Sequence, residues 1–195
     1  MARKLFPLTL MMIGVVFVAA GGYTAFRGLD AKQQVRGELL AQRIETTEDA
    51  SIPSTRVDDV GTARSMADAI DHHLREVTGG LTYAEMGRYM TDDGAPIGTD
   101  DPAAAVKGAN GRPLNNPLRA VAFEATTLRS SLYTSVMAFE MGNLVLGLGL
   151  VIVVVGFAVG GIGMVLRALL VPTLARRQVP ALPGTSALTP TPVQI

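Results

Sequence analysis

Two adjacent histidines, His72 and His73, are the only imidazoles in the chain and the first residues to consider for metal chemistry. Neighbouring residues of a helix point about 100° apart, so the two rings cannot easily hold one metal ion together. Zinc and iron sites use spacings such as i, i+4 and add further ligands. We therefore expect solvated surface histidines here and no metal site.

Two acidic pairs, Asp92-Asp93 and Asp100-Asp101, suggest calcium. A calcium-binding helix–loop–helix needs alternating acids, a central glycine and a glutamate at position twelve of its loop. Position twelve counted from Asp92 is Ala103. We interpret these acids as turn residues of a loop.

Glu140 is the last charged residue before a long uncharged run that ends at Arg167. A carboxylate inside hydrocarbon would indicate function, but the two residues lie about 40 Å apart along a helix and can occupy opposite headgroup layers. The sequence has no nucleophile elbow, phosphate loop, zinc signature, haem attachment motif or pair of catalytic carboxylates. We therefore predict that the chain is not an enzyme, with no catalytic residue, no metal and no cofactor.

Two uncharged runs determine the predicted fold class, Leu5 to Phe26 and Met141 to Leu166. Runs of 18 or more apolar residues are typical of helices that cross a bilayer. We predict an all-α integral membrane protein with two antiparallel transmembrane helices, residues 5–26 and 141–166. Between them lies an exported helical segment, residues 27–140.

Charge predicts the orientation. All 17 acids lie within residues 27–140, together with 12 of the 17 basic residues, so this segment carries −5. The other basic residues flank the two runs, at Arg3, Lys4, Arg167, Arg176 and Arg177. The positive-inside rule therefore places both termini, residues 1–4 and 167–195, in the cytoplasm and the middle outside. Neither basic cluster is long enough to indicate nucleic-acid binding.

The first run also permits a second interpretation, a cleaved signal peptide. Arg-Lys precedes a hydrophobic stretch, and Val18-Ala19-Ala20 resembles a cleavage site. Because 22 uncharged residues exceed a usual signal core, we favour a retained helix, and cleavage within residues 1–20 stays open. The chain has no cysteine, so the exported part must be held by packing, by its anchors or by a partner.

Glycines recur every seven residues in both runs, which places each set on one stripe of its helix. Close approach of backbones is what holds helices together in lipid, and glycine permits it. We predict a helix-packing interface, in which the two stripes face each other or a partner helix; the alternative is chance alignment in glycine-rich helices. The predicted interface residues are Gly14, Gly21, Gly28, Gly142, Gly149, Gly156, Gly160 and Gly163.

The exported segment contains predicted helices and a loop. Residues 27–44 are expected to extend the first membrane helix. Apolar residues from Val60 to Val77, spaced by three and four, predict an amphipathic helix that Asp58 or Asp59 caps and Gly79-Gly80 ends. Thr82 and Glu85 match a capping box, which predicts a short helix from Tyr83.

The remaining stretch, residues 91–117, has four glycines and four prolines, and we expect a mobile or partner-ordered loop. Asn116 and Pro117 predict the start of a helix that continues unbroken into the second run. That helix carries two hydroxyl rows, Thr126-Ser130-Thr134 and Thr127-Ser131-Ser135. Residues 179–195 are rich in proline and threonine, and we predict a disordered tail.

The segments Thr82 to Glu85 and Thr127 to Phe139, followed by the glycine-rich run, resemble a group of small two-span actinobacterial membrane proteins. Members of that group are sometimes labelled aromatic ring-opening dioxygenases. Such iron sites need two separated histidines and a carboxylate, and only His72-His73 is available here. In size and layout the chain is also similar to accessory subunits of the actinobacterial respiratory supercomplex.

These features favour a non-catalytic accessory or assembly subunit of a larger membrane complex, with the cytochrome bcc–oxidase supercomplex as the complex that the resemblance implies. The expected partners are other integral membrane proteins and the lipid bilayer, with no nucleic acid. Two alternatives remain: an envelope sensor whose spans shift on ligand binding, and a metal-dependent oxygenase built on the two histidines.

Overall fold

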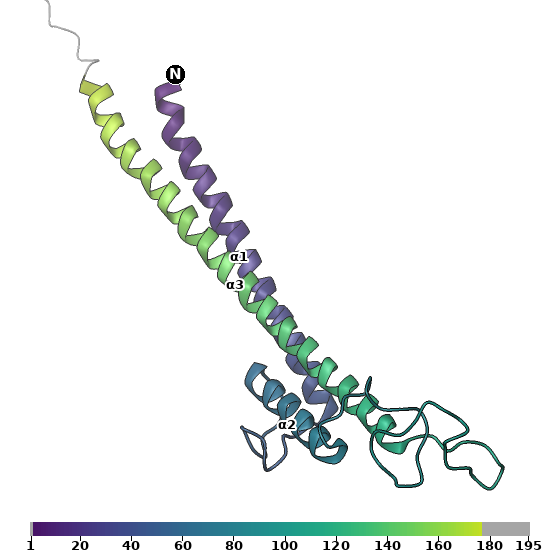
Figure 1. Ribbon diagram of the computed structural model, residues 1–195. Coiled ribbons are helices and arrows are strands. Elements are labelled where there is room, and N and C mark those ends of the chain that lie inside the picture. The colour runs from purple at the N-terminus through teal and green to yellow at the C-terminus, as the bar shows by residue number, and fades with distance from the viewer. Residues whose placement is uncertain (1, 177–195) are drawn as a thin grey trace, which may run out of the picture. The chain divides into compact units, whose positions relative to one another are not determined.

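The computed structural model describes residues 2–176, with side chains for residues 5–170. Within this range the chain forms three helices, α1 (Ala2–Gln42), α2 (Val60–Thr78) and α3 (Pro117–Arg176), and no extended strand (Figure 1). The described chain is therefore all-helical, as its sequence predicts. The predicted disordered tail lies outside the described residues, and so does Arg177.

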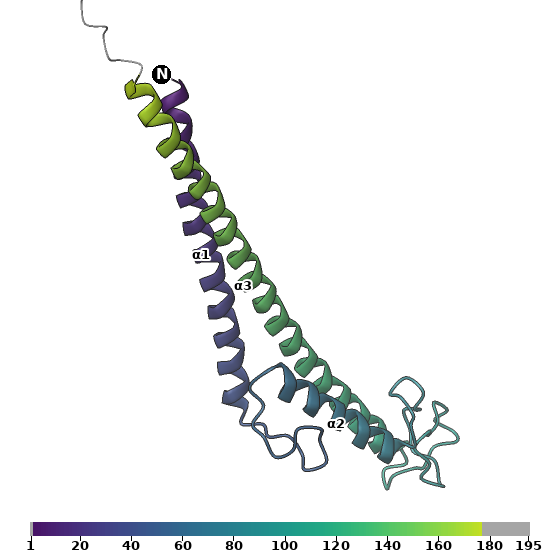
Figure 2. The same cartoon turned by 90° about the vertical axis from the view of Figure 1, so that its left-hand side faces the viewer.

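The chain divides into two compact units. The smaller unit consists of Met1–Gly21 with Val151–Ile195, and the larger unit is Gly22–Leu150. Both units contain part of α1 and part of α3, while α2 belongs to the larger unit alone (Figure 2). Each unit is therefore held by contacts between helices that are far apart in the sequence.

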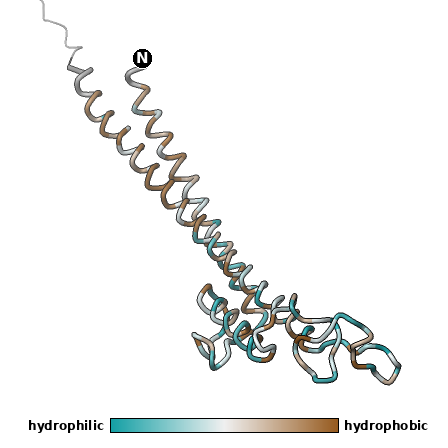
Figure 3. Tube along the Cα trace, in the orientation of Figure 1, coloured by the Kyte–Doolittle hydropathy of each residue, from teal (hydrophilic) through white to brown (hydrophobic). Residues whose placement is uncertain are grey.

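Two of the helices are long and apolar enough to cross a membrane, within Leu5–Gln42 and Pro117–Leu170. Their apolar stretches are coloured brown in Figure 3. Only 17% and 11% of the most apolar window of each helix is buried, whereas the core helix of a soluble protein would be mostly buried. Retention of the first helix stays a prediction, because a signal peptide would occupy the same position.

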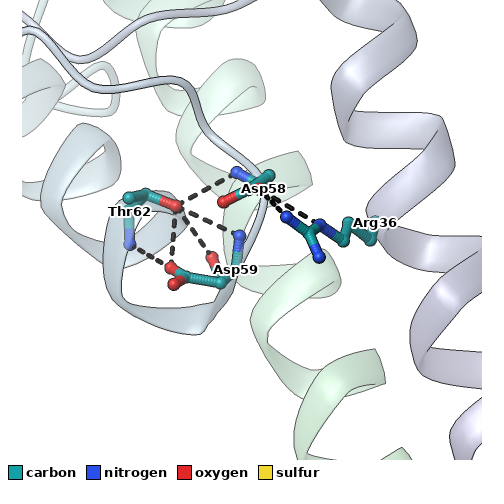
Figure 4. Close-up of polar contacts among 4 residues, drawn as sticks. All are labelled: Arg36, Asp58, Asp59 and Thr62. Carbon is teal, nitrogen blue, oxygen red and sulfur yellow. Dashed lines mark hydrogen bonds and ion pairs between the residues drawn. The ribbon is translucent and has the colours of Figure 1, made fainter.

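Local sequence signals set both ends of α2. The Asp59 carboxylate accepts a hydrogen bond from the Thr62 amide at 2.8 Å, and the Thr62 hydroxyl accepts one from the Asp59 amide at 3.1 Å (Figure 4). This reciprocal capping box satisfies donors that the first turn leaves without helical partners. Gly79 ends the helix with φ 64°, a left-handed conformation that glycine adopts without steric cost. The predicted boundaries of this helix are confirmed.

The core of the larger unit lies where the end of α1 meets α2 and the first half of α3. Small residues of α2, Ala63 and Ala67, allow close packing, and larger side chains of α3 fill the remaining space. The buried members of this core are Leu39, Val57, Ala63, Ala67, Leu132, Val136 and Phe139. α1 reaches this core because it continues to Gln42, as its sequence predicts.

Irregular backbone connects α2 to α3 and is bonded to itself. The Tyr89 and Thr99 backbones exchange hydrogen bonds at 2.9 Å in both directions, and Leu114 donates to Val106 at 2.9 Å. The predicted helix from Tyr83 is wrong. Glu85 accepts bonds from the Thr82 amide and hydroxyl at 2.8 and 2.7 Å, but these close only a turn. Mobility of the loop stays a prediction.

Asn116 connects this segment to α3. Its side-chain oxygen accepts from the Leu118 amide at 3.1 Å and so caps the helix that Pro117 begins. Its side-chain nitrogen donates to the Pro96 carbonyl at 3.0 Å and the Gly87 carbonyl at 3.3 Å. The predicted cap is confirmed, and the same buried amide also fixes two points of the preceding loop.

Candidate functional site: helix-packing faces and an arginine pocket

The two histidines lie on the surface of α2 and form separate pairs. His73 Nε2 lies 2.7 Å from Asp49 Oδ2, and His72 Nε2 lies 3.5 Å from Glu76 Oε1. Among the described residues no group of three or more metal-ligating side chains comes together. In the described structure each histidine therefore has its own carboxylate partner, from a different segment, and the two do not form a shared site.

The acidic pairs of the loop act on their own backbone. Asp93 accepts from the Thr91 hydroxyl at 2.6 Å and the Ala95 amide at 3.1 Å, and Asp101 accepts from the Ala103 amide at 2.8 Å. These bonds hold the pKa of the Asp93 carboxyl below its usual value, the Thr91 bond most strongly. These carboxylates therefore stabilise turns of the loop.

Glu140 is exposed on α3, where Asn143 donates to its carboxylate at 3.3 Å. The carboxylate therefore has the local partner expected of a helix-surface residue.

In the smaller unit the glycine stripes of α1 and α3 lie against each other. A Cβ atom added to Gly14 would lie 2.7 Å from the Gly156 carbonyl oxygen and 2.7 Å from the Gly160 Cα. One added to Gly163 would lie 2.9 Å from the Pro7 carbonyl oxygen. Real side chains essentially never approach this closely, so these helices touch through their backbones.

The larger unit continues the same type of contact. A Cβ atom on Gly28 would lie 2.6 Å from the Leu146 amide nitrogen and 2.8 Å from the Gly142 carbonyl oxygen. Gly142 in turn lies under the aliphatic part of Lys32. The other two predicted interface residues, Gly149 of this unit and Gly21 of the smaller unit, are both buried.

Burial within α1 and α3 follows the seven-residue period. The buried residues of α1 from Pro7 to Gly28 include Gly14 and Gly21, and those of α3 in the apolar run are Gly142, Gly149, Gly156 and Gly163. Glycines outside the stripes, such as Gly22 and Gly161, have nothing within 4 Å of an added Cβ. The spacing in the sequence therefore separates covered glycines from open ones.

A second face of α3, in the larger unit, is exposed and carries no charge. It is defined by Phe123, Thr127, Ser130, Thr134 and Met137, which follow one another at alternating spacings of four and three. We call these five residues the uncharged face. The Thr127 and Thr134 hydroxyls donate to the carbonyls of Phe123 and Ser130 at 2.8 and 2.9 Å. With those hydroxyls satisfied within the helix, the face presents mainly small or apolar surface.

The sequence shows the hydroxyl rows of this helix but not which side is covered. α2 packs on the opposite side of α3, against Leu132 and Val136, and leaves the uncharged face open. Phe123 is 57% exposed and Met137 is 70% exposed, high values for large apolar side chains outside the uncharged run. The alternating spacing of four and three could have identified this face from the sequence, but only if the position of the core had been known.

An arginine and two aromatic rings lie at the start of the uncharged face. The Arg119 guanidinium carbon lies 4.2 Å from the centre of the Tyr83 ring, a cation–π distance. Tyr83 in turn packs against Phe123, with ring centres 5.7 Å apart. Sequence reasoning missed this cluster, because Tyr83 and Arg119 are 36 positions apart and no local spacing relates them.

A related arginine on the same helix has a carboxylate partner, although its Nε atom, like that of Arg119, is buried without an acceptor in the described residues. Arg129 lies 5.6 Å from the Tyr133 ring and donates to Asp71 of α2 at 2.8 Å. Asp71 also accepts from Arg75 at 2.9 Å. These bonds link α2 to α3 beside the core and have a structural role.

Comparison with known proteins gives no relative. No protein-family model, no curated protein and no solved structure matches the chain.

Proposed function

We propose that this chain is a non-catalytic accessory or assembly subunit of a larger membrane protein complex. α1 and α3 cross the bilayer in opposite directions, both termini are cytoplasmic, and residues 27–140 are exported. The uncharged face of α3 contacts another integral membrane protein. The resemblance in layout points to the actinobacterial cytochrome bcc–oxidase supercomplex as the complex.

The observation that carries this proposal is the uncharged face. From Phe123 to Met137 it extends about 21 Å along α3, at 1.5 Å per residue. All five residues are exposed, and none is charged. By position these residues precede Glu140, so they stand in water under the proposed topology. An uncharged stripe with a large exposed apolar side chain at each end favours a protein contact there.

The contacts within each unit support an antiparallel pair. In the smaller unit Pro7 meets Gly163 and Gly14 meets Gly156, so rising positions in α1 match falling positions in α3. In the larger unit Gly28 meets Leu146 and Lys32 meets Gly142, so within that unit too rising positions in α1 match falling positions in α3. Because the glycines of α1 and α3 already contact each other, a partner protein must bind a different face of this helix pair.

The lengths of the uncharged runs support membrane insertion. Residues 5–26 give about 33 Å of helix and residues 141–166 about 39 Å, against a hydrocarbon core of about 30 Å. Large apolar side chains of these stretches are exposed, including Val15, Leu148 and Phe157. Lipid is the solvent that such a surface favours.

Cross-linking in native membranes tests the proposed contact. A photoreactive residue at Ser130 or Met137 should attach to a different membrane protein, while one at exposed Glu124, a charged position off the face, should not. Mass spectrometry of the product would identify the partner, with subunits of the respiratory supercomplex expected. A lone monomer after gentle detergent extraction, or products containing only this chain, would contradict the proposal.

Labelling of single cysteines tests the topology, because the chain has none of its own. Asp101→Cys should react with a membrane-impermeant maleimide on intact cells. Ser186→Cys should react only after the membrane is permeabilised. Reaction at both positions on intact cells would be incompatible with a cytoplasmic C-terminus.

A further inference from the structure

A pocket of about 390 Å³ opens at the start of α3, beside the uncharged face. The residues that give it its character are Tyr83, Arg88, Tyr89, Asn115, Arg119 and Phe123. Two guanidinium groups, two amides (Asn115 and Asn116) and two phenols line it, and no carboxylate does. The pocket is thus positive and rich in donors, with aromatic walls.

Arg119 has no anionic partner among the described residues. Its guanidinium carbon lies 4.2 Å from the centre of the Tyr83 ring, a cation–π contact, but the group forms no ion pair there. Its Nε atom is buried and lacks an acceptor in the described chain, as does the Nε atom of Arg129. A buried donor without a partner costs about 1–3 kcal/mol, and more when the group is charged. What distinguishes Arg119 from Arg129 is that no carboxylate among the described residues compensates its charge.

Arg129 shows the same arrangement with a carboxylate partner. It too lies over a tyrosine ring, Tyr133, and its Nη1 donates to the Asp71 carboxylate at 2.8 Å. Arg88, the other pocket arginine, is exposed and lies 3.5 Å from the exposed Asp100. Of these three arginines only Arg119 lacks a carboxylate, and it is the one that lines the pocket beside the uncharged face.

We propose that the pocket at Arg119 binds a carboxylate, supplied by an acidic side chain of the partner protein. A guanidinium stacked on an aromatic ring keeps its in-plane N–H groups free, and these match a planar carboxylate in a two-bond pair. Arg88, although paired with Asp100, adds further N–H donors, and Asn115 adds an amide donor. The source of the carboxylate rests on the proposed function; the existence of the site does not.

A lipid phosphate does not reach this pocket under the proposed topology. Arg119 precedes Glu140 by 21 residues, which is about 31 Å of helix. The headgroup layer extends only about 5–8 Å beyond the hydrocarbon on each side. The ligand must therefore come from a molecule that projects as far from the bilayer as this chain does.

Binding of small probes to the full chain in nanodiscs of neutral lipid tests the site. The probes are N-acetylglutamate, the uncharged N-acetylglutamine and inorganic phosphate, and the readout is the NMR signal of the carbon-labelled Tyr83 ring. We expect a saturable shift with N-acetylglutamate and none with N-acetylglutamine. Equal shifts with both amino-acid probes, no saturation, or binding of phosphate alone would overturn the proposal.

Three variants locate the binding. Arg119→Gln should weaken N-acetylglutamate binding at least tenfold, and Arg119→Lys, which keeps the charge but loses the planar fork, should weaken it less. Arg112→Gln removes an exposed arginine outside the pocket and should bind as the unaltered chain does. Unchanged binding by Arg119→Gln would overturn the proposal. If cross-linking finds no partner while these results hold, the proposed function fails and the site stands.

Discussion

The backbone of Gly14 in α1 touches the backbone of Gly156 in α3. A Cβ atom at position 14 would lie 2.7 Å from the Gly156 carbonyl oxygen, and one at position 156 would lie 2.8 Å from the Gly14 carbonyl oxygen. Neither obstacle is a flexible side chain, so a methyl group at either position forces the helices apart. The contact is thus sensitive to the smallest possible change of side chain.

We expect Gly14→Ala to destabilise the helix pair by about 1–3 kcal/mol, because it overpacks a backbone contact. Gly22→Ala is the matched control, since nothing lies within 4 Å of an added Cβ there. That variant should be neutral or stabilising by up to about 1 kcal/mol through helix propensity. Thermal unfolding in detergent, followed by circular dichroism, measures both. Equal effects of the two variants would mean that the stripe is not a packing interface.

The Asp59 cap should make the stability of α2 fall at acidic pH. The amide and hydroxyl of Thr62 donate to the Asp59 carboxylate and hold the pKa of that carboxyl below its usual value. The stabilisation is therefore complete above the unfolded pKa of about 3.9 and is lost as the pH falls through the lower folded value. Unfolding of α2 monitored from pH 7 to pH 2.5 should show this loss.

Two substitutions separate the cap from its charge. Asp59→Asn keeps a capping oxygen and should keep most of the stability while removing this contribution to the acid dependence. Asp59→Ala should cost about 1 kcal/mol at neutral pH. If Asp59→Asn shows the same loss in acid as the unaltered chain, other carboxylates are responsible. The nearby Arg36–Asp58 pair is exposed on the arginine side and should contribute less than about 1 kcal/mol (Figure 4).

Asn116 should couple the start of α3 to the loop before it. Asn116→Asp keeps the oxygen that caps the helix but loses the nitrogen that donates to Pro96 and Gly87. We expect faster hydrogen exchange in residues 87–99 with little change in the first turn of α3. Asn116→Ala should increase exchange in both regions. Confinement of both effects to the helix would show that the loop does not depend on this side chain.

Burial should determine the cost of losing a phenylalanine from α3. Phe139 is 4% exposed in the core of the larger unit, and Phe139→Ala should cost about 3–5 kcal/mol. Phe123, on the uncharged face, is mostly exposed, and Phe123→Ala should cost less than about 1 kcal/mol. Urea unfolding in detergent compares the two. In the cross-linking assay the order should reverse, with the larger loss of partner contact for Phe123→Ala.

Local signals predict the elements whose ends are set by neighbouring residues. Asp59 and Gly79 bound α2, and Asn116 with Pro117 begins α3, because each acts within a few positions of itself. The Thr82–Glu85 pattern fails although one of its two hydrogen bonds forms, since the following residues bond to Ile97 and Thr99 across the loop instead. A capping pattern provides a helix start only where the next turn has no better partner.

Periodicity predicts which glycines are covered but not every contact that matters. The seven-residue spacing distinguishes Gly14 from Gly22, because a stripe on a regular helix follows from the helical repeat. The Arg119 pocket could not be predicted in this way. It depends on Tyr83 being brought to α3 by an irregular segment whose path is set by long-range hydrogen bonds.

The glycine spacing also restricts how α1 and α3 can slide. A shift of one residue, about 1.5 Å, would place a side chain where Gly14 and Gly156 now touch. The next glycine of the stripe is Gly21 on α1, seven residues or about 10 Å away, and Gly160 on α3, four residues or about 6 Å away. Small movements of the two helices along their axes are thus sterically blocked.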